Sequence, residues 1–175
     1  MQTKLFSQGT RIRLSLAALA LLAGCATAAP QRTAANCNVP TAEVLQRVNA
    51  ARAAGARCGG KVAQPARPLR WDDRLYSAAA AHSADMARRN YIEHRSPDGT
   101  EVTQRVDASA YPWKSVGENL AAGDLTLDGA VQGWIGSPAH CENMMDPKFV
   151  DVAVACVSRS GTDLGTYWTM ILARK

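Results

Sequence analysis

Residues 150–172 read VDVAVACVSRSGTDLGTYWTMIL, and this stretch decides the fold class. Over residues 150–155, valines alternate with alanine and aspartate, which is the two-residue period of a half-buried strand. Residues 160–163 (SGTD) are typical of a turn, and residues 164–172 then predict a partner strand. The end of the chain is therefore expected to be an antiparallel hairpin.

The residues before this hairpin change to helical spacing. Apolar residues recur at intervals of three and four, and glycine or proline separates one such segment from the next. A loop is expected at 58–70, and the stretch at 111–124 reads as irregular or strand-like. Helices followed by a hairpin predict an α+β domain with helices packed on an antiparallel sheet. The first expected helix is capped by Thr41 and runs up to Gly55, and the second begins at 72 or 73 and stops around 90. A third begins near Thr100, a fourth spans about 126–135, and a short helical turn is expected at 139–145.

The first residues indicate an export signal. Three basic residues precede the ten apolar residues 14–23 (LSLAALALLA). Ten helical residues rise about 15 Å, half of what a bilayer core requires, so this run predicts a signal peptide and not a membrane span. It ends in Leu22-Ala23-Gly24-Cys25, which resembles the bacterial lipobox, whose cysteine becomes the acylated first residue. The alternative is an ordinary secretory signal cut within residues 26–29.

This interpretation divides the chain into three parts: a lipoprotein signal peptide (1–24), a lipidated tether (25–40) and a folded domain (41–175). The tether is predicted because its residues are small, polar and punctuated by proline. We expect the domain to be exported and anchored by Cys25 to the membrane of the cell envelope, which is the outer membrane if the host is Gram-negative.

Removal of the signal changes the charge balance. The whole chain has 20 basic and 15 acidic residues, and residues 1–24 hold three of the basic ones. The remainder therefore carries 17 basic and 15 acidic residues, a net charge of +2. That balance gives no reason to expect a nucleic-acid partner.

The cysteine count points to an oxidising compartment. With Cys25 used for lipid, four cysteines remain, an even number that predicts two disulfides in an exported chain. Proximity in sequence favours Cys37–Cys58 and Cys141–Cys156 among the three possible connectivities. A four-thiolate zinc site is the alternative, but no CxxC spacing supports it.

Three histidines and one glutamate are candidate functional residues. His82 shares an apolar helical stripe and is interpreted as a buried core histidine, whereas His140 opens a helical turn, where no helix dipole would favour it. His94 could simply be a cation at a helix end before a proline turn. Glu118 lies in a small and apolar stretch, so it should need a cationic or hydrogen-bonding partner. His94, Glu118 and His140 could bind zinc, form an acid–base pair or build a buried polar network.

These residues also carry a family resemblance. Residues 94–99 (HRSPDG), 117–121 (GENLA) and 134–143 (WIGSPAHCEN) resemble the three signatures of the CAP superfamily, in order and in spacing. That superfamily includes cysteine-rich secretory proteins, antigen 5 and pathogenesis-related 1 proteins, and this chain is similar to its bacterial SCP-domain lipoprotein branch. The resemblance covers residues 43–173.

The resemblance implies a three-layer α-β-α sandwich with a central antiparallel sheet and a cleft lined by two histidines and two glutamates, in some members with zinc. His94, Glu118 and His140 match three of these positions, and Ser137 stands at the fourth. The cleft residues expected here are therefore His94, Glu118, Ser137 and His140, with His94 and His140 as the possible zinc ligands.

The function expected from the sequence is a lipid-anchored binding module without enzymatic activity. Its ligand at the histidine–glutamate cleft would be lipidic, a cell-wall component or a protein. The alternative is a metal-assisted hydrolase that acts on peptide or cell-wall substrates. A third hypothesis gives the polar cluster a purely structural role.

Overall fold

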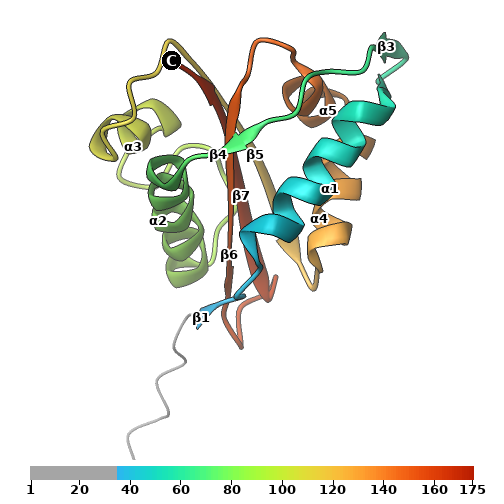
Figure 1. Cartoon of the computed structure of the whole chain (residues 1–175). Coiled ribbons are helices and arrows are strands. Elements are labelled where there is room, and N and C mark those ends of the chain that lie inside the picture. Colours follow the sequence, from blue (N-terminus) through green and yellow to red (C-terminus); the bar gives the residue numbers. More distant parts are fainter. Residues whose placement is uncertain (1–34) are drawn as a thin grey trace, which may run out of the picture. The chain divides into compact units, whose positions relative to one another are not determined.

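The computed structural model describes residues 35–175. The predicted signal peptide, Cys25 and most of the predicted tether lie outside the described residues. A central sheet separates two layers of helices, α2 and α3 on one face and α1, α4 and α5 on the other (Figure 1). The α+β class and the three-layer sandwich are thus confirmed.

Four strands of the sheet are antiparallel and follow the order β1-β6-β7-β5. The predicted hairpin is β6 (Asp151–Ser158) and β7 (Thr166–Arg174), with Val154 opposite Met170. Strand β5 (Ser115–Gly123) pairs with β7 along its whole length and forms one edge of the sheet.

Two short strands cover the other edge of β6. Strand β1 (Ala35–Asn36) pairs with the end of β6, and β4 (Arg70–Trp71) pairs with its beginning in parallel orientation. The sheet is therefore antiparallel, as predicted, except at β4, which makes it mixed. A two-residue strand is too short to show a period in the sequence.

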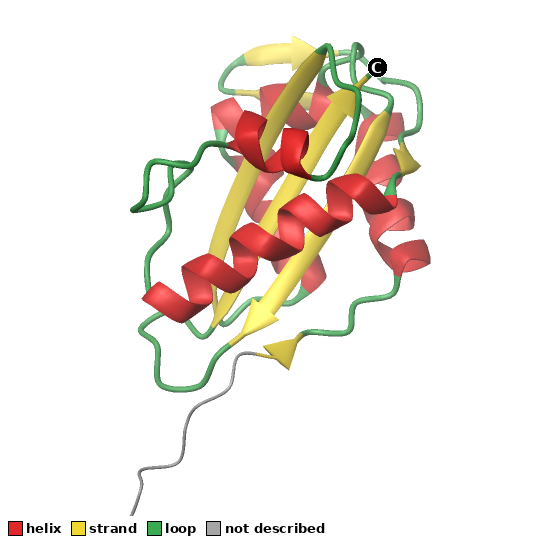
Figure 2. Cartoon of the chain, turned by 90° about the vertical axis from the view of Figure 1, so that its left-hand side faces the viewer, coloured by secondary structure: helices red, strands yellow, loops and turns green. Residues whose placement is uncertain are grey.

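One helix layer consists of α2 (Asp73–Arg89) and α3 (Val102–Ala108). Helix α2 lies across the face of the sheet and packs on β6 and β7 (Figure 2). The Asp72 carboxylate caps it by accepting a hydrogen bond from the Arg74 N–H. Its buried side includes the stripe predicted from the sequence, with Leu75 and His82 at most 1% exposed.

The opposite layer consists of α1 (Thr41–Ala54), α4 (Leu127–Gly136) and α5 (Pro138–Met145). Trp134 of α4 is 1% exposed and donates a hydrogen bond from Nε1 to the Leu120 carbonyl of β5 at 2.9 Å. Proline is at the first position of α5, where its missing N–H costs no helical hydrogen bond. The apolar side chains of this layer and the facing side of the sheet form the larger part of the core.

The stretch predicted as a loop at 58–70 contains a small hairpin. Strands β2 (Ala56–Cys58) and β3 (Lys61–Ala63) pair across Gly59 and Gly60, which both have positive φ. A side chain at Gly59 would place its Cβ 2.7 Å from Cβ of Pro138, so the tip of the hairpin packs directly on the start of α5. Strands of three residues around two glycines gave no periodic signal.

The two disulfides join Cys37 to Cys156 and Cys58 to Cys141. The pairing predicted from sequence proximity, Cys37–Cys58 and Cys141–Cys156, was therefore wrong. Cys37 follows β1 and donates its N–H to the Cys156 carbonyl at 3.1 Å, so strand pairing brings these cysteines together. Cys141 lies in α5, against which the β2–β3 hairpin folds.

The contacts of β1 and Cys37 place the start of the folded part before residue 41, where the domain was predicted to begin. Residues 35–37 were assigned to the tether, but β1 and the Cys37 disulfide fasten them to β6. Within residues 35–175, every helix is too short or too polar to cross a membrane.

Candidate functional site

A tight turn places His94 beside the edge of the sheet. Asn90 ends α2 in the left-handed conformation, and its side chain accepts a hydrogen bond from the Tyr167 hydroxyl at 2.7 Å. The Gly99 N–H donates to the Ser96 carbonyl at 2.8 Å, which closes the predicted Ser-Pro-Asp-Gly turn. The backbone around His94 is thus tied to both α2 and β7, and the imidazole lies beyond the end of the helix.

Glu118 is the central buried charge of the site. It lies on β5 opposite Ile171, and its side chain is only 2% exposed. Arg105 of α3, whose side chain is 7% exposed, donates from Nη2 to Glu118 Oε2 at 2.9 Å. His94 Nδ1 lies 2.8 Å from Glu118 Oε1. Both carboxylate oxygens therefore have a partner, as the sequence argument required.

Arg105 also fixes the turn that carries His94. Its Nη2 donates to the His94 carbonyl at 2.9 Å, and its Nη1 donates to the Thr100 carbonyl at 3.0 Å. One guanidinium therefore positions the carboxylate and the histidine backbone together. The alternative in which His94 only ends a helix does not describe this geometry, because the imidazole is held by Glu118.

His140 approaches from the opposite helix layer. It lies in the first turn of α5, and its ring centroid is 6.4 Å from that of His94, with 60° between the ring planes. The structure therefore brings His94, Glu118 and His140 together at the β5 edge, as their motifs predicted. The His94 side chain is 57% exposed, so the site opens to solvent on its histidine side.

Two asparagines hold α5 against β5. Asn119 is fully buried and donates from Nδ2 to the His140 carbonyl at 2.9 Å. Asn143 donates to Asn119 Oδ1 at 3.1 Å and to the Glu118 carbonyl at 3.3 Å. A side chain at Gly117 would lie 3.0 Å from the Phe149 ring, so glycine permits this close approach. Together these contacts explain the residue types of the Gly-Glu-Asn motif.

The two imidazoles have opposite electrostatic environments. The hydrogen bond to Glu118 raises the pKa of His94 above its usual value. Burial lowers the pKa of His140, and the positive charge of His94 lowers it further. The site therefore favours the protonated form of His94 and the neutral form of His140, each in comparison with a free imidazole.

His82 is a buried core residue, as interpreted from the sequence. It is 1% exposed, and its Nε2 donates to the Glu93 carbonyl at 3.0 Å, so it supports the segment that leads to His94. Burial lowers the pKa of His82, which favours the neutral ring.

The donor set fits zinc poorly. A catalytic zinc site takes three protein ligands, and within residues 35–175 no three His, Cys, Asp or Glu side chains are grouped to hold a metal. Both oxygens of Glu118 are occupied, one of them by the Arg105 cation. Ser137 lies between α4 and α5, where its carbonyl accepts the Cys141 N–H at 2.8 Å. The part of Ser137 in the cleft stays a prediction.

Sequence reasoning missed Arg105, Asn119 and Asn143. An arginine on a short helix is usually solvated, so its residue type gave no warning. Its position did carry a signal, because residue 105 follows Val102 by three and precedes Val106, and these three share one face of a helix. The two asparagines lie inside the motifs that were noted, but they were given no role.

Comparisons with known proteins agree with this geometry. A family model described as "CAP: Cysteine-rich secretory protein family" matches residues 45–172. The chain is 32% identical over 106 residues to the uncharacterized protein YkwD of Bacillus subtilis, a match that covers 61% of this chain and 39% of that protein. A second B. subtilis protein, the uncharacterized membrane protein YlbC, is 28% identical over 86 residues and is covered to 25%. The chain thus spans well under half the length of these relatives.

Solved structures show the same fold. An extracellular protein of Bacillus anthracis that contains an SCP domain is 29% identical, with a TM-score of 0.55, over 63% of this chain and 35% of that chain. An outer surface protein of Borrelia burgdorferi is 19% identical, with a TM-score of 0.62, over 82% of this chain and 100% of that chain. At 19% identity the second likeness shows the fold alone.

Proposed function

This chain belongs to the cysteine-rich secretory protein (CAP) family, and we propose that it is a binding module of the cell envelope, lipid-anchored and without enzymatic activity. Its ligand, a lipidic, cell-wall or protein component, would contact the cleft of His94, Glu118 and His140. The ligand would present a hydrogen-bond acceptor or a negative charge to the protonated His94.

One observation carries this proposal: the carboxylate of the site has no free oxygen. Arg105 holds one oxygen of Glu118 and His94 holds the other. Each oxygen keeps a second lone pair, but the Glu118 side chain is only 2% exposed, so little of the carboxylate is accessible to a substrate or a metal. A binding site, in contrast, needs fixed polar groups that face the ligand. Glu118 therefore supports the orientation and charge of His94, and the exposed imidazole is the group that meets the ligand.

The alternative, a metal-assisted hydrolase, requires a third metal ligand in addition to the two imidazoles. Glu118 could supply it, but the carboxylate is buried and paired, so reorienting it toward a metal would disturb its ion pair with the buried Arg105. This cost is the reason for placing the hydrolase second.

The cellular location rests on independent features. Two disulfides are typical of an oxidising compartment outside the cytosol. The lipobox-like Leu22-Ala23-Gly24-Cys25 supports acylation at Cys25. We therefore propose that the domain is exported and held at a membrane of the envelope by its N-terminal lipid.

The cleft can be tested on the purified full chain and its His94→Ala and Glu118→Gln variants. Mass spectrometry of co-purifying molecules, zinc content and thermal unfolding are measured on each protein, together with binding of soluble cell-wall fragments and of phosphatidylglycerol vesicles. We expect at least about a tenfold loss of ligand binding in both variants, equivalent to about 1.4 kcal/mol. Arg57→Gln, an exposed residue of the β2–β3 hairpin that is not one of the cleft residues, is the matched control and should bind normally.

Two outcomes would contradict the binding module. Stoichiometric zinc with metal-dependent turnover would establish the hydrolase instead. A large loss of stability in both variants, with no ligand and no metal in the wild type, would leave the cluster a structural role.

The anchor has a separate test. Cys25→Ala should release the protein from the membrane fraction, because the substituted residue cannot be acylated. If the variant stays in that fraction after a high-salt wash, the lipid anchor at Cys25 is wrong.

A further inference from the structure

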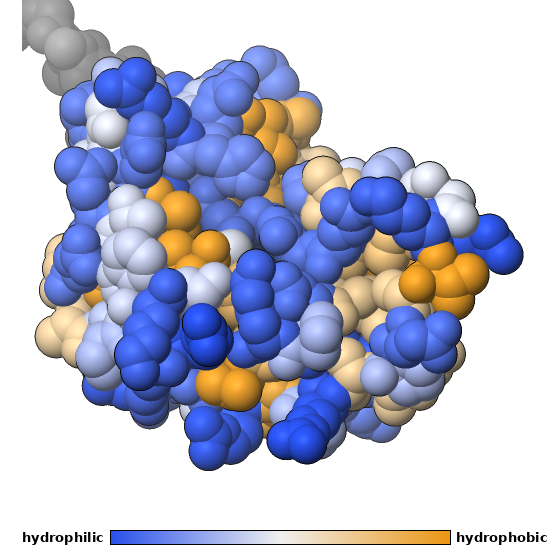
Figure 3. Space-filling model, turned by 90° about the horizontal axis from the view of Figure 1, so that it is seen from above, coloured by the Kyte–Doolittle hydropathy of each residue, from blue (hydrophilic) through white to orange (hydrophobic). Residues whose placement is uncertain are grey.

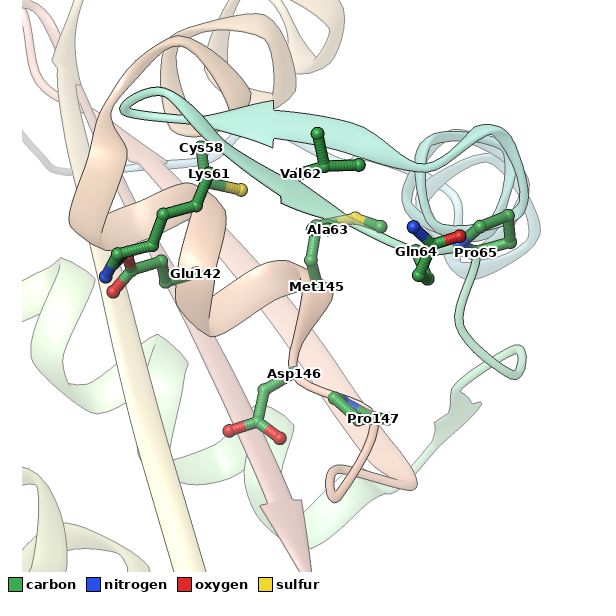
Figure 4. Close-up of a pocket in the computed structure, with 10 residues that line it drawn as sticks. All are labelled: Cys58, Lys61, Val62, Ala63, Gln64, Pro65, Glu142, Met145, Asp146 and Pro147. Atoms are coloured by element: carbon green, nitrogen blue, oxygen red, sulfur yellow. Dashed lines mark hydrogen bonds and ion pairs between the residues drawn. The ribbon is translucent and has the colours of Figure 1, made fainter.

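A hollow of about 360 Å³ lies between the β2–β3 hairpin and the end of α5 (Figure 4). Its walls include Val62, Ala63, Pro65 and Pro147, and Met145 is the last residue of the helix whose first turn carries His140. The volume is within the usual range for ligand sites, and this hollow shares no lining residue with the histidine cleft.

A second hollow of about 700 Å³ continues the first. Pro65 and Pro147 line both, and the second extends to Arg67 and Val150. We call the two together the hairpin groove. Val62 is 63% exposed and Val150 is 40% exposed, so large apolar side chains face solvent near both ends. Seen from above, hydrophobic atoms also gather on the side of the molecule where β3 lies (Figure 3).

The hairpin groove is fixed on two sides. The Cys58–Cys141 disulfide joins the hairpin to α5 at one end. At the other end the fully buried Arg52 of α1 donates to the carbonyls of Met144 at 2.6 Å, Asp146 at 3.1 Å and Arg67 at 2.9 Å. A groove that is held open before binding requires little further ordering when a ligand enters.

Strand β3 borders the groove with an unpaired edge. Among the described strands it pairs only with β2, and the hollow is lined by all three residues of β3 but by only Cys58 of β2. An exposed strand edge offers backbone donors and acceptors to another extended chain. Addition of a peptide strand to such an edge is a common mode of recognition.

The charges along the groove favour a negatively charged partner. Lys61 is paired with Glu142 at 2.8 Å, Asp146 with Lys148 at 2.8 Å and Arg70 with Asp151 at 3.1 Å. The Arg67 guanidinium, in contrast, has no hydrogen bond or ion pair within residues 35–175. The backbone carbonyl of Arg67 accepts a hydrogen bond from Arg52, so its unpaired positive charge projects from a fixed position on the surface.

We propose that the hairpin groove binds an extended segment of a partner protein, which adds to the edge of β3. Its apolar side chains would lie over Met145 and between the two prolines, and an acidic residue would pair with Arg67. This site is distinct from the proposed ligand site at His94, with which it shares no lining residue, although Glu142 of its wall follows His140 by two positions.

The probe is a synthetic peptide, N-acetylated and C-amidated, of sequence Thr-Val-Thr-Val-Glu-Glu, titrated to roughly millimolar concentration, where binding energies of about 4 kcal/mol are still detected. NMR shift changes of the labelled full chain are expected at residues 61–67 and 145–150. Val62→Asp and Arg67→Glu should each weaken binding about five- to tenfold. Ile92→Asp, which also replaces an exposed large apolar residue, and Arg57→Glu, which makes the same change of charge, lie outside the groove and should not weaken binding.

Four results would overturn the proposal. The first is the absence of any shift change at millimolar peptide. The second is equal binding of a peptide with two lysines in place of the glutamates. The third is decanoate producing the shifts at 61–67 while the peptide produces none, because the groove would then take an amphipathic small molecule. Shift changes confined to residues 94, 118 and 140 would also count against it, without affecting the proposed function.

Discussion

Helix α5 separates two regions that are built in different ways. At its first turn, the histidine cleft is polar, and hydrogen bonds to a buried carboxylate hold it together. At its last turn, the hairpin groove is mostly apolar, and a disulfide and the Arg52 guanidinium hold its walls. The comparison teaches that one short helix can position two surfaces whose stabilities depend on different chemistry. Protonation should therefore affect the cleft, and reduction should affect the groove.

The largest effect should come from removing the cation of the cleft. Arg105→Met leaves Glu118 buried beside a half-exposed histidine, and loss of one partner of a buried pair typically costs about 3–5 kcal/mol. Urea unfolding at neutral pH measures this change. The control is Arg47→Met, which breaks a pair whose side chains are 46% and 58% exposed and should change stability little.

The double variant Arg105→Met, Glu118→Leu sharpens this test. It removes both charges at once, so it should recover much of the loss. If Arg105→Met does not change the stability, Glu118 does not depend on the guanidinium, and the account of the cleft is wrong.

A smaller loss of stability is expected when the disulfide beside the hairpin groove is removed. Replacing Cys58 and Cys141 by serine removes a cross-link between residues 83 apart, which should cost roughly 2–4 kcal/mol. Amide shifts should change at residues 56–65, while those at 94 and 118 stay in place. Loss of the His94 environment in this variant would contradict the separation of the two regions.

The smallest free-energy effect, but the most specific, is the titration of the two histidines. The pKa of His94 should lie above the ordinary value of about 6.5 and that of His140 below it. NMR of the ring protons reads both directly. Glu118→Gln should lower the pKa of His94 and, because the positive charge next to it is then reduced, raise that of His140.

These shifts have opposite consequences for stability. His94 binds its proton more tightly in the folded state, so its stabilisation is complete below about pH 6.5 and is lost as pH rises through the folded pKa. His140 resists protonation when folded, so its effect is to destabilise the protein as pH falls below about 6.5. Identical pKa values for the two rings would contradict the electrostatic description of the cleft.

Periodicity was enough to predict the long elements. The stripe of α2 and the alternation of β6 each repeat over several turns or residue pairs, so the pattern is strong. Strands β3 and β4 have three and two residues and cannot show a repeat. The disulfides were mispaired because nearness along the chain does not measure nearness across layers.

The site was predicted only in part for a similar reason. His94, Glu118 and His140 were found because their residue types are rare in their surroundings and their motifs resemble a family. Arg105 has an ordinary residue type for a helix, and its role depends on where α3 packs against β5. The sequence showed that Glu118 needs a partner. Which residue fills that role can be seen only from the three-dimensional structure.

The Cys37–Cys156 bond also has a mechanical consequence. It joins the first described segment to the end of β6, across 119 positions of sequence. If the chain is pulled between the first described segment and its C-terminus, the load passes through this covalent bond and bypasses the residues it encloses. Backbone tension then bypasses residues 38–155, which carry the helices and both binding regions, and acts on the chain after residue 156, where β7 is held by its pairing with β6 and β5. The disulfide thereby shields the residues that it encloses from a pull on the two ends of the chain.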